Sequence, residues 1–320
     1  MKKEKVLVTG GAGFIGSNLT EELLNKGYHV IVVDDLSTGS MDNLKAFSTN
    51  PDLKFLCFSI NDLKSLRTAC QEVVYVFHQA ALPSVPRSVS DPIATNHANI
   101  NGTLNVLIAA RDAGVKKVVY ASSSSVYGDT PTLPKVETMP PCPLSPYAAS
   151  KIAGEYYCTA FTASYGLPTA SLRYFNVYGP RQAADSAYSA VIPRFITAIK
   201  NGKPPEIFGD GNQTRDFTFV KDVVNANILA ATSSATGAFN IGTGTRISLN
   251  ELANTIIQMA GKASITPVYS ETRAGDVAHS LADITQAQNE FGYNALYDLR
   301  QGLQATIDKF DAYNEGVSGR

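Results

Sequence analysis

Residues 6–16 read VLVTGGAGFIG, and this stretch decides the fold. Residues 6–9 are apolar or β-branched and predict a strand, and residues 14–25 repeat apolar side chains at helical spacing. The glycines between them predict a tight turn in which bare backbone N–H groups approach a pyrophosphate at the positive end of the helix dipole. The stretch therefore predicts a dinucleotide-binding turn.

The glycine spacing and the residue that closes the next predicted strand indicate which dinucleotide binds. Gly10, Gly13 and Gly16 follow the pattern G-x-x-G-x-x-G, one residue longer than the commoner G-x-G-x-x-G. Asp34 ends the second predicted strand, 18 residues after Gly16. A carboxylate at that place accepts hydrogen bonds from the adenosine ribose and repels a 2′-phosphate. NAD is therefore expected as the cofactor in preference to NADP.

Short apolar runs alternate with helical patterns through the first half of the chain. The predicted strands cover residues 6–9, 30–33, 55–58, 73–77, 118–120 and 169–173, and the predicted helices include residues 14–25 and 96–113. Continuous apolar strands between helices are typical of a parallel sheet covered on both faces. We expect an α/β fold with a doubly wound parallel (Rossmann) sheet and a smaller, interleaved C-terminal substrate domain.

The second half of the chain has a looser pattern. Helices are predicted over residues 222–231, 249–260 and 299–313, and a short strand over residues 239–241 can return to the main sheet. We therefore expect residues 1–176 to form the NAD-binding domain, with residues 216–247 returning to it, and residues 177–320 to form the substrate domain.

Charge and composition argue against several classes of function. The 320 residues include 27 basic and 28 acidic side chains, so no net field attracts the chain to nucleic acid or to an anionic membrane. No apolar run reaches the roughly 18 residues that span a bilayer, and the apolar start of the chain is too short for a signal peptide. The four cysteines show no CxxC spacing and the four histidines no metal-ligand spacing. We expect a cytoplasmic protein without a metal site.

A tyrosine and a lysine four residues apart are the first candidate catalytic groups. Residues 147–151 read YAASK after a proline-rich loop, so Tyr147 and Lys151 share one face of a predicted helix. A free phenol has a pKa of about 10, and an ammonium one turn away favours the phenolate. Lys151 is therefore expected to lower the pKa of Tyr147 and to make it an effective acid/base group at neutral pH.

A run of serines supplies the third candidate group. Residues 122–128 read SSSSVYG and directly follow the fifth predicted strand. Hydroxyls at the carboxyl end of a parallel strand lie where such sheets bind their ligands. A serine in this run is therefore expected to hydrogen-bond the reacting hydroxyl and to steady the proton transfer.

From the glycine turn through residues 172–181 (LRYFNVYGPR) to residues 273–276 (RAGD), the chain resembles the extended short-chain dehydrogenase/reductases, and among them the UDP-hexose 4-epimerases. The resemblance implies that Ser123 joins Tyr147 and Lys151 in a catalytic triad, with Lys151 also anchoring the nicotinamide ribose. It further implies that Tyr147 takes the O4 proton while the C4 hydride passes to the nicotinamide. The 4-keto sugar then swings about its diphosphate and receives the hydride on its other face, and NAD stays bound.

The resemblance also implies two sets of binding residues and a homodimer. The expected cofactor contacts are Gly10, Gly13, Phe14, Ile15, Gly16, Asp34, Asp35, Ser37, Gly39, Ser59, Ile60, Gln79, Ala80, Ala81, Asn99, Tyr147, Lys151 and Tyr174. The expected UDP-sugar contacts are Ser84, Ser123, Ser124, Asn176, Ala190, Val191, Ile207, Phe208, Arg215, Arg273, Asp276 and Ser280. Among these, three side chains are expected at the diphosphate: Asn176, Arg215 and Arg273. The dimer interface is expected on the helix after Asn96 and on the two last helices.

Two serines separate the possible reactions within this family. The resembling dehydratases place Asp and Glu right after the triad hydroxyl, and decarboxylating relatives keep a Glu two residues after it. Here these positions are Ser124 and Ser125, which cannot act as carboxylate acid/base groups. Simple epimerisation is therefore expected.

The size of one residue bears on the choice of sugar. Ser280 stands where epimerases restricted to non-acetylated sugars look bulkier, often Tyr, so space remains for an N-acetyl group at C2. Pro83, where the acetylated-sugar subgroup carries Gly, and Ser59, where many relatives carry Asp, depart from the pattern. The hypothesis is interconversion of UDP-N-acetylglucosamine and UDP-N-acetylgalactosamine.

Two alternatives stay open. One is a UDP-glucose or UDP-glucuronate 4-epimerase, which would use the same triad. The other is a non-catalytic NAD-sensing binding protein on the same fold, since a fold does not fix a function. The intact set of Ser123, Tyr147 and Lys151 weighs against the second alternative.

Overall fold

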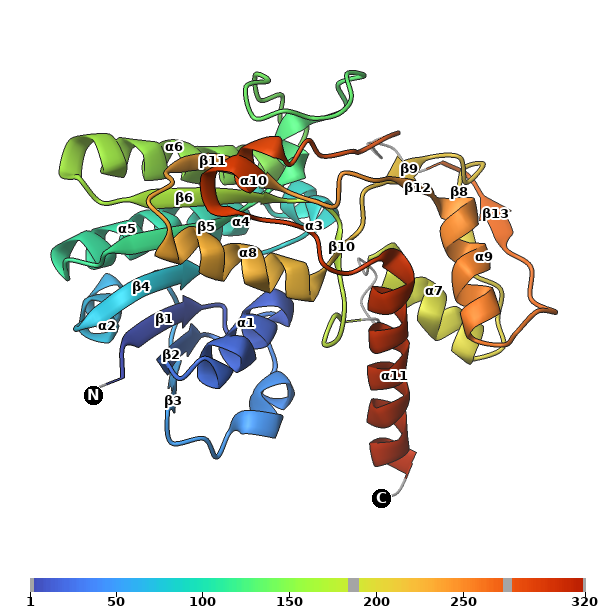
Figure 1. The fold of residues 1–320 in the computed structure, drawn as a ribbon, viewed down its shortest axis with the longest axis horizontal. Coiled ribbons are helices and arrows are strands. Elements are labelled where there is room, and N and C mark those ends of the chain that lie inside the picture. Colours follow the sequence, from blue (N-terminus) through green and yellow to red (C-terminus); the bar gives the residue numbers. More distant parts are fainter. Residues whose placement is uncertain (1–2, 184–189, 273–277, 319–320) are drawn as a thin grey trace.

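A seven-stranded parallel sheet forms the centre of the computed structural model, which describes residues 3–183, 190–272 and 278–318, with side chains described up to residue 310 (Figure 1). The strand order is β11-β6-β5-β4-β1-β2-β3. The strands are β1 (Lys5–Thr9), β2 (His29–Asp34), β3 (Leu53–Cys57), β4 (Val73–His78), β5 (Lys117–Ser123), β6 (Thr169–Tyr174) and β11 (Gly237–Ile241). The chain runs outward from β1 through β2 to β3, and then outward from β4 in the other direction, so the order reverses between β1 and β4. The predicted doubly wound sheet is confirmed.

Both faces of the sheet are covered, since successive residues of the inner strands belong to two different apolar clusters, one on each face. Val6 and Val8 pack with α1 (Phe14–Asn25) and α8 (Val220–Thr232), whereas Leu7 packs on the opposite side. The helices of that opposite side are α2 (Leu63–Ala69), α5 (Gly102–Asp112) and α6 (Pro146–Tyr165). The α10 helix (Thr285–Phe291) lies against β11. Burial on both faces explains the uninterrupted apolar strands.

The helix predicted over residues 96–113 is confirmed, and it contains a π-helical turn near its start. The chain forms α4 (Pro92–Asn96), a π-helical turn η2 (His97–Asn101) and only then α5. The Thr103 hydroxyl donates a 2.6 Å hydrogen bond to the carbonyl of Asn99, and the Asn99 side chain is bound to the backbone of Leu82. Such side-chain insertions into the backbone ladder are a known cause of helix irregularity.

A second apolar cluster lies beside the sheet, on the right of Figure 1, and it joins three helices. These are α7 (Val191–Lys200), α9 (Leu249–Met259) and α11 (Leu299–Ser318). Three short strand pairs accompany them: β7 (Val177–Tyr178) with β10 (Thr218–Phe219), β9 (Thr214–Arg215) with β12 (Ile247–Ser248), and β8 (Glu206–Phe208) with β13 (Val268–Ser270). Since β11 pairs with β6, the second half of the chain does return to the main sheet, whereas the domain boundary at residue 176 stays a prediction.

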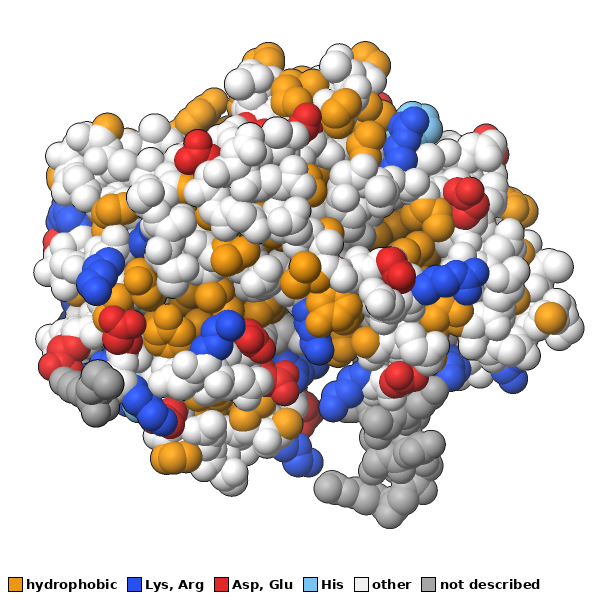
Figure 2. Space-filling model, in the orientation of Figure 1, with side chains coloured by type: hydrophobic (Ala, Val, Ile, Leu, Met, Phe, Trp, Pro, Cys, Tyr) orange, Lys and Arg blue, Asp and Glu red, His pale blue; other side chains and the backbone are white. Residues whose placement is uncertain are grey.

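The remaining short elements surround the carboxyl edge of the sheet. They are the 3-10 turns η1 (Met41–Phe47) and η3 (Ser124–Tyr127) and the helix α3 (Val85–Ser90). Basic and acidic side chains are interspersed over the face seen in Figure 2. Among the residues described here, no helix is both long enough and apolar enough to cross a bilayer.

Candidate active site

The carboxyl ends of four neighbouring strands bring the predicted site residues to one edge of the sheet. Thr9 at the end of β1 pairs with His78 at the end of β4, and Ser123 at the end of β5 pairs with Tyr174 at the end of β6. The glycine turn, the segment 79–82 and the serine run therefore follow adjacent strands. This edge, at the reversal of strand order, is where open parallel sheets bind ligands.

The three glycines of the turn have different tasks. Gly10 has φ +69°, and a Cβ there would lie 2.6 Å from the backbone nitrogen of Ala80. A Cβ at Gly16 would lie 2.1 Å from the carbonyl oxygen of Gly10. A Cβ at Gly13 would meet only one atom within 4 Å, that same oxygen at 3.2 Å, so bare backbone faces open space there. Together with the unpaired N–H groups of the first turn of α1, this surface fits a pyrophosphate.

The Asp34 carboxylate is held in place by two backbone N–H donors and can accept further hydrogen bonds. Its carboxylate accepts hydrogen bonds from the N–H groups of Ala12, at 2.9 Å, and Leu36, at 2.8 Å. Burial raises the pKa of this carboxyl, and the two backbone bonds oppose that rise. Each oxygen keeps a second lone pair for a ribose hydroxyl, so the residue fits the adenosine end of NAD. A Cβ at Gly39 would lie 3.0 Å from this carboxylate.

The other expected cofactor residues lie around this edge, and several of their side chains are hydrogen-bonded to protein groups. The Tyr174 hydroxyl donates to the Gln79 side chain, and Gln79 donates to Asn227. Asn99 is buried, with its side chain bound to Leu82 and Ser150. Their polar groups are thus committed to protein partners. Six further expected contacts are placed as follows: Phe14 and Ile15 pack at the start of α1, Asp35 accepts from the N–H of Ser37, Ser59 accepts from Asn61, and Ile60 packs beneath Gly102.

The predicted triad comes together where α6 begins beside the end of β5. Ser145 caps the helix by accepting a 3.1 Å hydrogen bond from the N–H of Ala148, which places Tyr147 in the first turn. The Ser123 hydroxyl hydrogen-bonds the phenol of Tyr147. Lys151 is only 3% exposed, its Nζ lies 5.7 Å from the Tyr147 ring centroid, and it donates a 2.8 Å bond to the carbonyl of Ala121.

The predicted direction of the Tyr147 pKa shift is wrong. Burial raises the pKa of Tyr147, and the hydrogen bond with Ser123 opposes the rise. Removing water disfavours a phenolate, and the ammonium of Lys151 does not outweigh that effect. Burial also lowers the pKa of Lys151 to about 8, although the negative charge of Glu155 opposes the shift. Both charged forms are therefore costly at this site.

The expected UDP-sugar residues divide into a connected pair and several separate ones. The Asn176 amide donates to the Ser280 hydroxyl at 3.0 Å and to the carbonyl of Asp216 at 2.9 Å. The remaining residues are placed as follows: Ser84 caps α3, Ser124 begins η3, Ala190 and Val191 begin α7, Ile207 is buried in the second cluster, Phe208 lies under Arg194, and Arg215 donates to the carbonyls of Thr214 and Ala278. Because the Ile207 side chain is in that apolar core, its expected contact with the UDP-sugar would have to come from its backbone. Arg273 and Asp276 lie outside the described residues.

Backbone strain occurs at several residues of the same edge, independently of the motifs. Five non-glycine residues in the described ranges have positive φ: Leu36, Glu72, Ser84, Asn176 and Arg181. Two are expected UDP-sugar contacts, and Leu36 lies between two expected cofactor residues. Such conformations cost about 1–3 kcal/mol each and persist mainly at functional sites.

Sequence reasoning missed a set of buried polar side chains behind the site. Arg173 and Glu155 form an ion pair at 2.7 Å, with both side chains 5% exposed, and Ser122 donates to Glu155. His78 is buried between two threonines. The spacing of Glu155 four residues after Lys151 was the available signal, since both then face the same strand.

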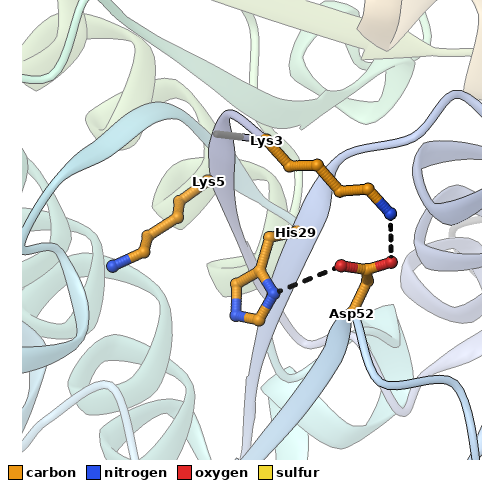
Figure 3. A pocket seen from close by; sticks show the side chains of 4 residues that line it. All are labelled: Lys3, Lys5, His29 and Asp52. Atoms are coloured by element: carbon orange, nitrogen blue, oxygen red, sulfur yellow. Dashed lines mark hydrogen bonds and ion pairs between the residues drawn. The ribbon is translucent and has the colours of Figure 1, made fainter. Parts of the chain in front are cut away.

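A pocket at the opposite edge of the sheet has no part in this site. Lys3, Lys5, His29 and Asp52 line it at the amino ends of β1 and β2 (Figure 3). Lys3 and His29 point toward Asp52, and Lys5 points away from it to pair with Glu72. Within the described part of the chain, no cluster of His, Cys, Asp and Glu could hold a metal ion.

Known proteins resemble this chain over nearly its whole length. Residues 6–242 match the NAD dependent epimerase/dehydratase family. The UDP-glucose 4-epimerase of Mycolicibacterium smegmatis is 41% identical over 310 residues, which cover 96% of this chain and 98% of that relative. The structure of UDP-N-acetylglucosamine 4-epimerase from Methanobrevibacter ruminantium, in complex with UDP-N-acetylmuramic acid, has a TM-score of 0.93 and 41% identity, covering 98% of this chain and 100% of that one. Thermus thermophilus UDP-glucose 4-epimerase in complex with NAD has a TM-score of 0.87 and 37% identity, covering 96% and 99%.

The buried ammonium of Lys151 predicts a gain of stability when it is removed. Its pKa falls from 10.5 in the unfolded chain to about 8, so the unfolded state binds more protons between these values and stability rises with pH there. At pH 7 the cost is fully present, about 3 kcal/mol at roughly 1.4 kcal/mol per pKa unit. Lys151→Met should therefore raise the free energy of unfolding at pH 7 by up to about 3 kcal/mol, and the gain should shrink as the pH rises from about 8 and be small above pH 10.

Urea unfolding at both pH values measures this difference. Lys116→Met is the matched control, because the Lys116 side chain is 67% exposed and its removal should change little. A Lys151→Met variant less stable than the parent at pH 7 would contradict the assigned cost.

Proposed function

The chain belongs to the NAD-dependent epimerase/dehydratase family, and we propose that it is the member that interconverts UDP-N-acetylglucosamine and UDP-N-acetylgalactosamine. It uses NAD as its cofactor and acts as a UDP-sugar 4-epimerase. The observation that carries the reaction type is the meeting of Ser123, Tyr147 and Lys151 at one edge of the sheet, with serines at the two positions after Ser123.

Tyr147 is the proposed acid/base group at O4 of the sugar. Its raised pKa keeps it protonated at neutral pH until a partner stabilises the phenolate. Ser123 stabilises the phenolate by donating a hydrogen bond to it. The Lys151 ammonium adds a favourable charge, and its effect is stronger because water is excluded. The low pKa of Lys151 means that this charge is lost as the pH rises through about 8.

The glycine turn and Asp34 are the proposed holders of the cofactor. When bound, NAD supplies a hydride acceptor for C4 of the sugar and returns a hydride to the opposite face. The bare backbone at Gly13 takes the pyrophosphate, and Asp34 takes the adenosine ribose. Lys151 hydrogen-bonds the nicotinamide ribose, which gives its buried ammonium a second partner beside the carbonyl of Ala121.

Serines in place of carboxylates restrict the chemistry to epimerisation. Ser124 begins the η3 turn, and Ser125 follows it with its N–H bonded to the Ser123 hydroxyl at 3.2 Å. Neither hydroxyl can remove a proton from C5 or assist a decarboxylation at neutral pH. The 4-keto sugar can therefore only rotate about its diphosphate and be reduced again. Asn176 and Arg215 are the proposed phosphate partners.

Ser280 is the proposed determinant of the sugar. It is 9% exposed, and its hydroxyl accepts from Asn176, so a small side chain lies directly against a proposed diphosphate contact. A tyrosine there would fill the space that an N-acetyl group needs. The relatives above are named for both UDP-glucose and UDP-N-acetylglucosamine, so the family alone leaves the sugar open. UDP-glucose and UDP-glucuronate are the alternative substrates.

Replacing the acid/base group tests the reaction. Tyr147→Phe should lower kcat by about 10²- to 10⁴-fold, because proton transfer at O4 loses its positioned group, while UDP-sugar affinity stays within a few-fold. Chromatographic separation of UDP-N-acetylhexosamines measures the turnover. Full activity in this variant would exclude Tyr147 as the acid/base group, and an inactive parent protein that binds NAD would favour the sensor alternative.

Replacing Ser280 tests the sugar. The parent protein should form UDP-N-acetylgalactosamine from UDP-N-acetylglucosamine in preference to UDP-galactose from UDP-glucose. Ser280→Tyr should reduce the ratio of the two kcat/KM values by about 10- to 200-fold. Ser280→Ala is the control, since it keeps the space and removes only the hydroxyl that accepts from Asn176 and from the N–H of Asp216. A parent protein that turns over UDP-glucose alone would overturn this part of the proposal.

We also propose that the chain forms a homodimer, with its interface on α4 and α6 instead of the expected helix after Asn96 and two last helices. The only charged residues of α6, Lys151 and Glu155, are both buried, so its outer face has no charge along 20 residues. Tyr156 on this face is 61% exposed, and Ile93 on the adjoining α4 is 81% exposed. A charge-free, partly aromatic helix face is typical of an interface between subunits.

Charge reversal of this face tests the dimer. The double variant Ile93→Glu/Tyr156→Glu should elute as a monomer in size-exclusion chromatography with light scattering, because two carboxylates would be buried in each half of the interface. Val268→Glu, on the exposed strand β13, is the matched control and should stay dimeric. A monomeric parent protein would contradict the proposal.

A further inference from the structure

A closed ring of buried hydrogen bonds surrounds the segment that follows β4. Thr9 Oγ1 lies 2.7 Å from His78 Nδ1, and His78 Nε2 lies 2.9 Å from Thr103 Oγ1. Thr103 Oγ1 donates to the carbonyl of Asn99 at 2.6 Å, and the Asn99 side chain bonds both backbone groups of Leu82. The N–H of Ala80 closes the ring on Thr9 Oγ1 at 3.3 Å. His78 is 1% exposed and forms the centre of this ring.

The hydrogen bonds of the ring can run in only one direction. A carbonyl only accepts, so the single hydroxyl hydrogen of Thr103 goes to Asn99. Thr103 must then accept from His78, which places the ring hydrogen on Nε2 and leaves Nδ1 bare. Thr9 must therefore donate to Nδ1, and its oxygen is free to accept from Ala80. The network thus defines one neutral tautomer of His78.

The ring is joined to the catalytic helix through Asn99. The Asn99 amide donates to Ser150 Oγ at 3.0 Å, and Ser150 donates to the carbonyl of Tyr147 at 2.7 Å. One chain of hydrogen bonds therefore runs from the end of β1, beside the glycine turn, to the first turn of α6.

We propose that His78 is a positioning residue that sets the distance between the cofactor-binding turn and the catalytic Tyr147. It touches neither reacting group and acts through Thr9 on one side and through Thr103 and Asn99 on the other. A misplacement of about 1 Å at a reacting group is enough for a large loss of rate. Since Tyr147 is catalytic only under the proposed function, this role rests on that function.

The surroundings of His78 keep it neutral. The Lys151 ammonium on α6 opposes a second positive charge, and the Tyr120 ring on β5 lies 5.5 Å away and offers no carboxylate. On the β1 and α5 sides the His78 imidazole faces only the two threonines. Burial, with Lys151, lowers the pKa of His78 to about 3, so the bare Nδ1 persists from neutral pH down to about pH 5.

Paired substitutions of the two threonines separate hydrogen bonding from packing. Thr9→Val and Thr103→Val keep the shape and remove the hydroxyl, whereas Thr9→Ser and Thr103→Ser keep the hydroxyl and remove a methyl group. If the chain positions the site, each valine variant should lose about 10- to 100-fold in kcat, and each serine variant should stay within about threefold. Thr169→Val is the control, a buried threonine at the amino edge of the sheet, and should keep full activity.

The double variant and the bound cofactor complete the test. If both threonines act through His78, Thr9→Val/Thr103→Val should be no slower than the slower single variant, whereas independent defects multiply. The NAD content of each purified protein, measured after denaturation, should stay near that of the parent for the Thr103 variants, which lie away from the glycine turn. Serine variants as slow as the valine variants, or multiplying losses, would overturn the proposal.

A measurement on the unaltered protein decides the matter even where a valine variant fails to fold. Nitrogen NMR of ¹⁵N-histidine-labelled protein should show, for His78, a protonated Nε2 and an unprotonated Nδ1 from neutral pH down to about pH 5. The opposite tautomer, or an imidazolium in that range, would overturn the proposal. If Tyr147→Phe left turnover intact, the proposed function would fail on its own, whatever the histidine spectrum showed.

Discussion

Close packing of helix α6 on strand β5 is the constraint on which the site depends. A Cβ at Gly154 would lie 2.3 Å from the hydroxyl of Tyr120, so the helix approaches the strand as nearly as its backbone allows. Lys151, one turn before Gly154, donates to the carbonyl of Ala121, and Glu155, directly after Gly154, accepts from Ser122. Because β5 ends at Ser123, the same contact that seals the core also brings the three candidate catalytic groups together.

The exclusion of water that makes this packing stable also sets the protonation of the site. It raises the pKa of Tyr147 and lowers that of Lys151, so neither charged form is favoured until the reaction requires it. The same dry interior strengthens each fixed dipole and charge that faces the sugar. Stability is lost so that a phenol and an ammonium can lie side by side out of water.

Local features of the sequence predicted the sheet, the glycine turn and the triad, because each depends on residues close together in the chain. The long-range contacts could not be predicted in this way. Asn176 and Ser280 meet through their side chains although 104 residues separate them, and the helix after Asn96 contains a π-helical turn where the Asn99 side chain bonds the backbone of Leu82. The sign of the Tyr147 pKa shift was predicted wrongly, since helical spacing carries no information about burial.

In the proposed reaction, the sugar is oxidised and re-reduced at C4 by a cofactor that stays bound. The most direct test uses UDP-N-acetylglucosamine labelled with deuterium at C4, incubated with the NAD-loaded protein in ordinary water and analysed by mass spectrometry and NMR. Hydride transfer to and from a cofactor that stays bound predicts that the UDP-N-acetylgalactosamine formed keeps its deuterium at C4. Loss of the deuterium to solvent would contradict it, because the hydrogen would then have left C4 as a proton.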